Sequence, residues 1–332
     1  MTLKPKKSGL NKSLCPGFLI SLAISSLAIS SAEAAITQTW KADWTMFENP
    51  TGPGSAGNII PGNASGGGSG GTVNINETLP INSYVKGYTS LNFDKQTGTL
   101  KSGTDINAKI IQNTGSGNQG YLDFSFESTN QVSFTDQLTI SAGPGGWGSL
   151  KVKIKTNGSL QHFGEIVEAA YGFSPTKLDN ELSINASLGG NANSISSNIS
   201  SDFFGLSFGS KSSDADSDII NDEFTLVIPW TSSDPVNFTF DYKEALSFST
   251  DGLDTSYVSF SAKNDFGHTL DLYADVFDQN GNLIENATIT SSEGINYQSL
   301  AQSQTPVPVP GAFFMFAPAL LGFVVLRRRT EQ

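Results

Sequence analysis

Cysteine is almost absent from this chain: one residue of 332, Cys15, carries a thiol. It precedes most of an N-terminal apolar run, and Pro16 follows it. The preceding Ser13-Leu14 pair lacks the small residues that a lipidation site needs, so we do not interpret Cys15 as a lipid attachment site. If this segment is removed, the protein has no disulfide, no thiolate metal site and no cysteine nucleophile.

Histidine is nearly as scarce, with only His162 and His268. The sequence contains no H-E-x-x-H zinc motif and no G-x-S-x-G nucleophile motif. A Ser-His-Asp trio stays open because serine is plentiful, although no motif indicates one. We expect a structural hydrogen-bonding role for His268, and we predict that the protein is not an enzyme.

Charged residues make up 15% of the chain, and basic ones are scarcest between the termini. Of the 19 Lys and Arg residues, four lie within residues 1–12 and three at 327–329, which leaves twelve. Of the 31 acidic residues, removing Glu33 and Glu331 leaves 29, so the body carries twelve minus 29, or a net charge of −17. Such a body repels nucleic acid and anionic lipid headgroups, which excludes nucleic-acid binding.

Residues 1–34 have the organisation of a secretory signal peptide. A basic start at 1–12 precedes an uncharged apolar run at 18–29, and Ala32 and Ala34 then frame a small-x-small cleavage site. The run is shorter than the roughly 20 apolar residues of a membrane-spanning helix. We therefore predict cleavage after Ala34 and export by the Sec translocon and signal peptidase.

Residues 305–332 form a tail in three parts. Prolines alternate with valine over 306–310, which favours an extended segment without backbone pairing. Residues 311–326 are uncharged and mostly apolar, and as a transmembrane helix they would span roughly 24 Å, short of the roughly 30 Å hydrocarbon core. A helix this short suits a transient inner-membrane anchor, while an ordinary single-pass anchor stays open.

A cluster of three arginines ends the tail and predicts a stop-transfer signal held in the cytoplasm. The cluster consists of Arg327, Arg328 and Arg329. Signal peptide, proline segment, short helix and arginines together resemble the PEP-CTERM sorting signal. Its motif maps to Val307, Pro308, Val309 and Pro310, and Val309 stands where the named form has Glu. The resemblance implies processing by a membrane-embedded cysteine protease (exosortase) and transfer to the cell surface or an exopolysaccharide matrix.

Between the termini, helix formers are scarce. The whole chain contains 34 glycines and 22 phenylalanines. Period-2 alternation of apolar and polar residues recurs there with frequent turn signals. It predicts strands over 36–44, 121–128, 149–156, 223–230, 236–242, 256–262 and 269–278. Antiparallel strands with one apolar face each must pack face to face, so we predict an all-β, jelly-roll-like β-sandwich ectodomain over 73–304.

Glycine and asparagine punctuate this body. Residues 51–72 are rich in Gly, Pro, Ser and Asn and predict a flexible loop, which with one strand forms an N-terminal region over 35–72. No strand, helix and Lys pattern surrounds this loop, which argues against a phosphate-binding role. Hairpin turns are predicted at Thr97-Gly98, Thr156-Asn157-Gly158 and 279–282.

One helix is predicted over 162–173, as a cap on the sheets, with Glu165 and Glu168 on one solvated face. A carboxylate pair could instead cleave glycosides, but the solvated face is the simpler interpretation. A second resemblance covers 85–300: the segments 93–100 and 265–297 resemble exported β-domains called choice-of-anchor domains. It implies a sandwich fold and no known chemistry.

The sharpest polar cluster is Asp214, Asp216 and Asp218. This D-x-D-x-D pattern matches the first half of a calcium loop. Ile219 and Thr225 stand where that loop needs Gly and a bidentate Glu, so we interpret the cluster as a solvated acidic loop and expect no cofactor. Calcium is the alternative.

The sequence as a whole predicts a secreted, acidic, structural or interaction protein, sorted to the surface or matrix and associated with exopolysaccharide or biofilm. The alternative is a carbohydrate-binding module or polysaccharide-processing enzyme with the same tail. Trp147, between glycines, and Trp230, after a strand, are the body tryptophans that could serve such a site.

Overall fold

The computed structural model describes residues 34–48, 58–111, 121–142, 146–168, 175–204, 211–231, 234–253 and 255–297. Within these ranges the chain forms thirteen β-strands and no helix. The predicted all-β class is therefore confirmed. The signal peptide up to residue 33 and the tail from 305 onward lie outside the described residues, and no helix in the described part is long and apolar enough to cross a membrane.

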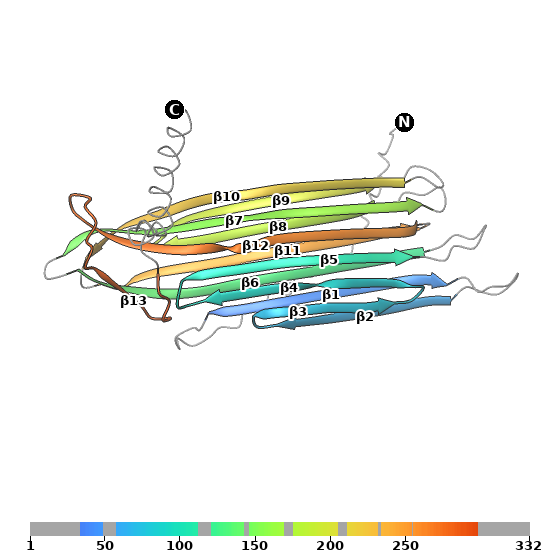
Figure 1. Cartoon of the computed structure of the whole chain (residues 1–332), viewed down its shortest axis with the longest axis horizontal. Helices are drawn as coiled ribbons and strands as arrows, with labels where there is room; N and C mark the ends of the chain where they lie inside the picture. Colours follow the sequence, from blue (N-terminus) through green and yellow to red (C-terminus); the bar gives the residue numbers. More distant parts are fainter. Residues whose placement is uncertain are drawn as a thin grey trace, which may run out of the picture. The chain divides into compact units, whose positions relative to one another are not determined.

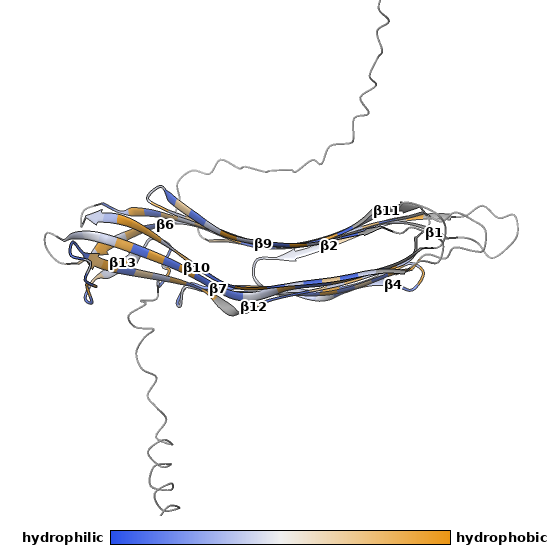
Figure 2. Cartoon of the chain, turned by 90° about the horizontal axis from the view of Figure 1, so that it is seen from above, coloured by the Kyte–Doolittle hydropathy of each residue, from blue (hydrophilic) through white to orange (hydrophobic). Residues whose placement is uncertain are grey.

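The strands form two antiparallel sheets that lie face to face (Figures 1 and 2). Sheet A has the order β2 (Asn58–Gly68), β1 (Ala35–Glu48), β6 (Tyr121–Ser141), β11 (Val236–Leu253), β8 (Pro175–Leu188) and β9 (Asn191–Phe204), and β13 (Thr288–Ser291) also pairs with β6. Sheet B has the order β10 (Lys211–Thr231), β7 (Trp147–Glu168), β12 (Thr255–Asp278), β5 (Thr99–Ile111), β4 (Ser83–Asp94) and β3 (Gly71–Leu79). Each of the predicted strands lies within one of these elements.

Alternation explains why these segments pair as two layers. In β5 every second residue is buried, and the residues between them are exposed or half-buried. Successive strand residues point to opposite faces, so one face of each strand enters the interior and the other meets solvent. Figure 2 shows both sheets bowed in the same direction, with the outer face of sheet A on the concave side.

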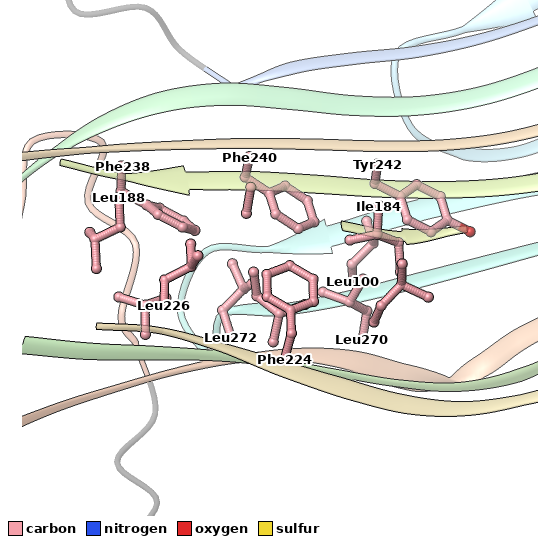
Figure 3. Close-up of a cluster of buried hydrophobic side chains, with 14 of the residues drawn as sticks. Leu100, Ile184, Leu188, Phe224, Leu226, Phe238, Phe240, Tyr242, Leu270 and Leu272 are labelled. Atoms are coloured by element: carbon pink, nitrogen blue, oxygen red, sulfur yellow. The ribbon is translucent and has the colours of Figure 1, made fainter. Parts of the chain in front are cut away.

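The interior contains two separate hydrophobic clusters. In the larger cluster, Phe238 and Phe240 from sheet A pack opposite Phe224 from sheet B (Figure 3). The smaller cluster is centred on Phe248 and Phe260, which come from opposite sheets and stack with ring centroids 4.2 Å apart. Burying aromatic rings of this size dominates core energetics, and stacked pairs add about 0.5–1.5 kcal/mol.

The predicted flexible loop is wrong where the structure describes it. Asn58–Gly68 forms the edge strand β2, paired with β1 in the same sheet as β6, so residues 35–48 and 58–68 belong to the sandwich and not to a separate N-terminal region. Gly62 lies opposite Trp44 and Gly66 opposite Trp40, and a Cβ at either glycine would overlap the facing indole. Because these glycines have no side chain, the tryptophan rings can pack directly against β2.

Two turn predictions are confirmed and one is wrong. Thr97-Gly98 joins β4 to β5, and Gly281, with φ +81°, lies in the turn after β12. Asn157-Gly158 instead lies inside β7, beside a β-bulge of the neighbouring strand β12. The two strands predicted over 256–262 and 269–278 lie on either side of this bulge and form the single strand β12. A Cβ at Gly158 would overlap the ring of Phe266, so this glycine makes room for a core side chain.

The helix predicted over 162–173 is wrong for 162–168, which continue β7. His162 and Gly164 are buried while Phe163 between them is 39% exposed, which is strand alternation. Pairing with β10 and β12 on both sides satisfies the backbone groups that a helix would have bonded internally. Glu165 and Glu168 therefore do not share a helical face, and residues 169–173 lie outside the described part.

Candidate functional site

The aspartates of the predicted acidic loop lie on a strand instead. Asp214, Asp216 and Asp218 occupy alternate positions of β10, in the same inward phase as the buried Ile220. β10 is the edge strand of sheet B, so its inward-facing side chains lie at the rim of the sandwich. Asp214 and Asp216 are exposed there, as predicted. Asp218 accepts a hydrogen bond from the Ser197 hydroxyl of β9.

The backbone of these residues does not have the shape of a calcium loop. Calcium ligands converge on the ion from a curled loop, whereas residues 214–218 are extended within β10. Among the residues that the structure describes, no three His, Asp or Glu side chains are placed to hold one metal ion. Residues 214–218 thus form a strand and not a loop, and calcium binding by these carboxyl groups stays untested.

His162 lies directly opposite Asp216 in the pairing of β7 with β10. It is 4% exposed, and its Nε2 is 2.7 Å from the Ser201 hydroxyl of β9. Its Nδ1 has no hydrogen-bond partner among the described residues. Burial lowers the pKa of His162 below its ordinary 6.5, although the carboxyl groups of Asp216 and Asp214 act in the opposite direction. Burial thus disfavours the charged imidazolium in the folded protein.

The two candidate tryptophans lie in different environments. Trp147 begins β7 and is 59% exposed, as its glycine-flanked position suggested. Trp230 is 2% exposed inside the larger cluster, and its indole N–H donates to the carbonyl of Phe277 at 3.3 Å. Only Trp147 of this pair is available to a ligand. His268 belongs to β12, and its structural role stays a prediction.

A buried polar layer, which the sequence analysis missed, separates the two hydrophobic clusters. On nine of the strands, a buried polar residue takes the place of an inward apolar one there. We call this layer the polar belt; it consists of Gln38, Thr89, Ser102, Thr104, Ser128, Asn130, His162, Asn180, Ser201, Glu244 and Asn264, all buried. On β11, for example, Glu244 lies between Tyr242 of the larger cluster and Leu246 of the smaller one.

Glu244 is the centre of the polar belt and is 2% exposed. Its Oε1 accepts hydrogen bonds from Thr104 at 2.5 Å and Asn264 at 3.0 Å. Its Oε2 accepts from the Ser102 hydroxyl and from the Tyr242 hydroxyl at 3.2 Å. These donors come from both sheets, so one carboxyl group joins the two layers.

The amide side chains of the polar belt extend this network. Asn180 of sheet A and Asn264 of sheet B exchange two hydrogen bonds, of 2.5 and 2.7 Å. Asn130 accepts from Thr89 at 2.5 Å and donates to Ser102 at 3.1 Å. Because these polar groups bond to one another, the arrangement favours a structural role over a catalytic one.

A second buried carboxyl group, Asp136 of β6, fastens the last described segment of the chain. Asp136 is fully buried and accepts from Ser291 Oγ at 2.6 Å, Ser292 Oγ at 3.0 Å and the Glu293 N–H at 3.2 Å. The Tyr297 hydroxyl also donates to it, at 2.7 Å. We call this arrangement the C-terminal clasp.

Two tyrosines bonded to these carboxyl groups predict an alkaline limit to stability. Burial first, and the neighbouring carboxyl groups second, raise the pKa of Tyr242 and Tyr297 well above the ordinary 10.0. Below about pH 10 both tyrosines are protonated in the folded and in the unfolded protein. Above it the unfolded chain ionises while the folded one does not, so stability falls by up to about 1.4 kcal/mol per pH unit for each tyrosine.

We expect Tyr297→Phe to flatten this decline relative to the parent, measured as urea unfolding midpoints between pH 8 and pH 11. Tyr88→Phe, at a 40% exposed position, is the control and should leave the slope unchanged. An unchanged slope in Tyr297→Phe would contradict the prediction.

Comparison with known protein families and with curated proteins found no match for this chain.

Proposed function

We propose that this chain is an exported structural or interaction protein, sorted to the cell surface or extracellular matrix and processed at its C-terminal signal. In this proposal its jelly-roll-like body associates with exopolysaccharide and performs no catalysis. Signal peptidase acts after Ala34, and an exosortase-like protease acts at 307–310 while residues 311–326 hold the chain briefly in the inner membrane. The sequence features of both termini support the route.

The observation that carries the proposal is the C-terminal clasp. A protein displayed through a C-terminal tail transmits load to its body through the segment just before that tail. Here that segment, Thr288–Tyr297, is bonded to β6 through Asp136, and Lys95 adds a 3.3 Å hydrogen bond to the Glu293 carbonyl. The segment that leads to the tail is thus held on the sandwich shortly before Pro306.

The edge strand β10 is consistent with a protein that works in a crowded matrix. A long edge strand presents unpaired backbone groups that invite another strand. The inward-facing carboxyl groups of Asp214, Asp216 and Asp218 oppose such pairing, because an added strand would bury them. This supplies a role for the acidic cluster without a metal ion.

The tail can be tested directly. Replacing Pro308 and Pro310 with alanine should leave export intact but trap full-length protein in the membrane, because the extended motif is lost. Deleting Arg327, Arg328 and Arg329 should weaken retention and release unprocessed chain. Immunoblots of membrane and matrix fractions measure both, and Pro306→Ala, outside the motif, is the control.

In the parent strain, mass spectrometry of matrix material should find no peptide spanning 313–327. If intact C-terminal peptides dominate there, a plain single-pass anchor replaces the sorting proposal. The alternative, a polysaccharide-processing enzyme with the same tail, would instead need a carboxylate pair beside the exposed Trp147.

A further inference from the structure

The outer face of sheet A contains a groove of about 720 Å³ that crosses β9, β8, β11 and β6 and reaches the start of β1. It lies on the concave side of the bowed sandwich (Figure 2). Its volume is in the range of ligand-binding clefts, about 300–1,000 Å³. None of the uses described above involves this face.

Strand register arranges the groove side chains in two rows across the sheet. The first row contains Ser194, Asn185, Asp241 and Ser133, each directly paired with the next. The second row contains Ser187, Thr239 and Thr135, also directly paired. Neighbours within a row are about 4.8 Å apart, and the rows are about 6.6 Å apart. A linear ligand would therefore meet regularly spaced polar groups if it lay across the strands.

The chemistry of the two rows is almost entirely that of hydroxyl and amide groups. Such groups both donate and accept hydrogen bonds, so they match sugar hydroxyls, which do the same. The Ser187 and Thr239 hydroxyls already bond to each other at 2.5 Å, which holds both in place. Asp241 is the one charged side chain among the described residues that line the groove, and it accepts from the Gln131 amide at 2.9 Å.

We propose that this groove binds a neutral glycan chain laid across the strands of sheet A. The lining residues that the structure describes include one carboxylate and no cation, which disfavours an acidic glycan because like charges repel. An extended peptide would need an unpaired strand edge for its backbone. Of the strands under the groove only β9, at the edge of sheet A, has one, so a chain laid across β8, β11 and β6 would find none. The glycan site makes the proposed matrix role more specific. It depends on that role only for where the glycan comes from.

The test uses the full chain, purified in mild detergent, in native affinity electrophoresis. The probes are hydroxyethylcellulose, dextran and the neutral fraction of the producing strain's exopolysaccharide, with alginate as the acidic comparison. At least one neutral polymer should retard the parent more strongly than alginate does. The double variant Asn185→Ala/Thr239→Val should bind that polymer at least tenfold more weakly.

The matched control is Asn107→Ala/Thr225→Val, which makes the same two changes at exposed positions of sheet B. It should bind as the parent does, and both double variants should keep the parent urea midpoint. No retardation by any neutral polymer, equal or stronger binding of alginate, or parent-like binding by the groove variant would each overturn the inference.

Failure of this inference is distinguishable from failure of the proposed function. The groove variant should still lose its tail and reach the matrix fraction, because groove and tail are separate. Normal tail processing without glycan binding would contradict the proposed groove site alone. Glycan binding without processing would contradict the proposed sorting route alone.

Discussion

Replacing Glu244 with alanine is expected to lower the free energy of unfolding by about 3–5 kcal/mol, measured by urea denaturation. The substitution removes the carboxyl group that accepts hydrogen bonds from the Ser102 and Thr104 hydroxyls and from the Asn264 amide. Each unsatisfied buried donor costs about 1–3 kcal/mol, and the removed side chain also leaves a cavity.

Two further variants separate these causes. Glu244→Gln keeps the side-chain volume and one acceptor oxygen, so we expect a loss of about 1–2 kcal/mol. Glu181→Ala removes an exposed glutamate from the neighbouring strand β8 and should change stability by less than about 0.5 kcal/mol. A Glu244→Ala variant as stable as the Glu181→Ala control would show that the polar belt contributes nothing to stability.

Replacing Asp136 with alanine is expected to release the segment from Thr288 to Tyr297. The variant loses four hydrogen bonds to one carboxyl group, and the edge-on contact of Tyr297 with Phe238 at 5.9 Å loses its support. We expect the free energy of local opening to fall by about 3 kcal/mol. Cleavage after Glu293 by a glutamyl endopeptidase should then accelerate at least tenfold, followed by mass spectrometry.

The control for this variant is Gln137→Ala. Gln137 is exposed and neighbours Asp136 on β6, and only its backbone bonds to Ser292, so alanine retains those bonds. Its cleavage rate should match that of the parent. If Asp136→Ala is cleaved no faster than this control, the clasp does not hold the segment.

Alternation predicted the sheet faces well, because one apolar side chain in two is enough to specify an inward face. The runs at 121–128, 223–230 and 236–242 all lie in strands of the expected kind. Which strands neighbour each other could not be predicted. That order depends on pairing between segments far apart in the chain, such as β5 with β12.

Two of the wrong predictions concern glycine. In Asn157-Gly158 and in 58–68, glycine was interpreted through its backbone freedom, whereas in the structure it provides space for Phe266, Trp44 or Trp40. A single sequence does not distinguish these two uses, because the large partner lies on another strand. The helix over 162–173 failed for a related reason: pairing on both sides of β7 outweighs local propensity.

The polar belt had a signal in the sequence that could have been used. Glu244 stands in the inward phase of 238–248, between Tyr242 and Leu246, where an apolar residue is expected. Asn264 breaks the inward phase of β12 in the same way. Several such breaks in different strands indicate one shared polar layer, although only the structure shows that they bond to one another.

The strand order also determines when the protein can fold. β11 lies between β6 and β8 in sheet A, and β12 lies between β7 and β5 in sheet B. Both central strands come from the last third of the chain, so every shorter nascent chain has two divided half-sheets with open edges. Folding must therefore wait until nearly the whole chain has emerged, as expected for a slow fold dominated by distant contacts. A chain that stays unfolded this long can still pass through a narrow protein-conducting pore, as the proposed export requires.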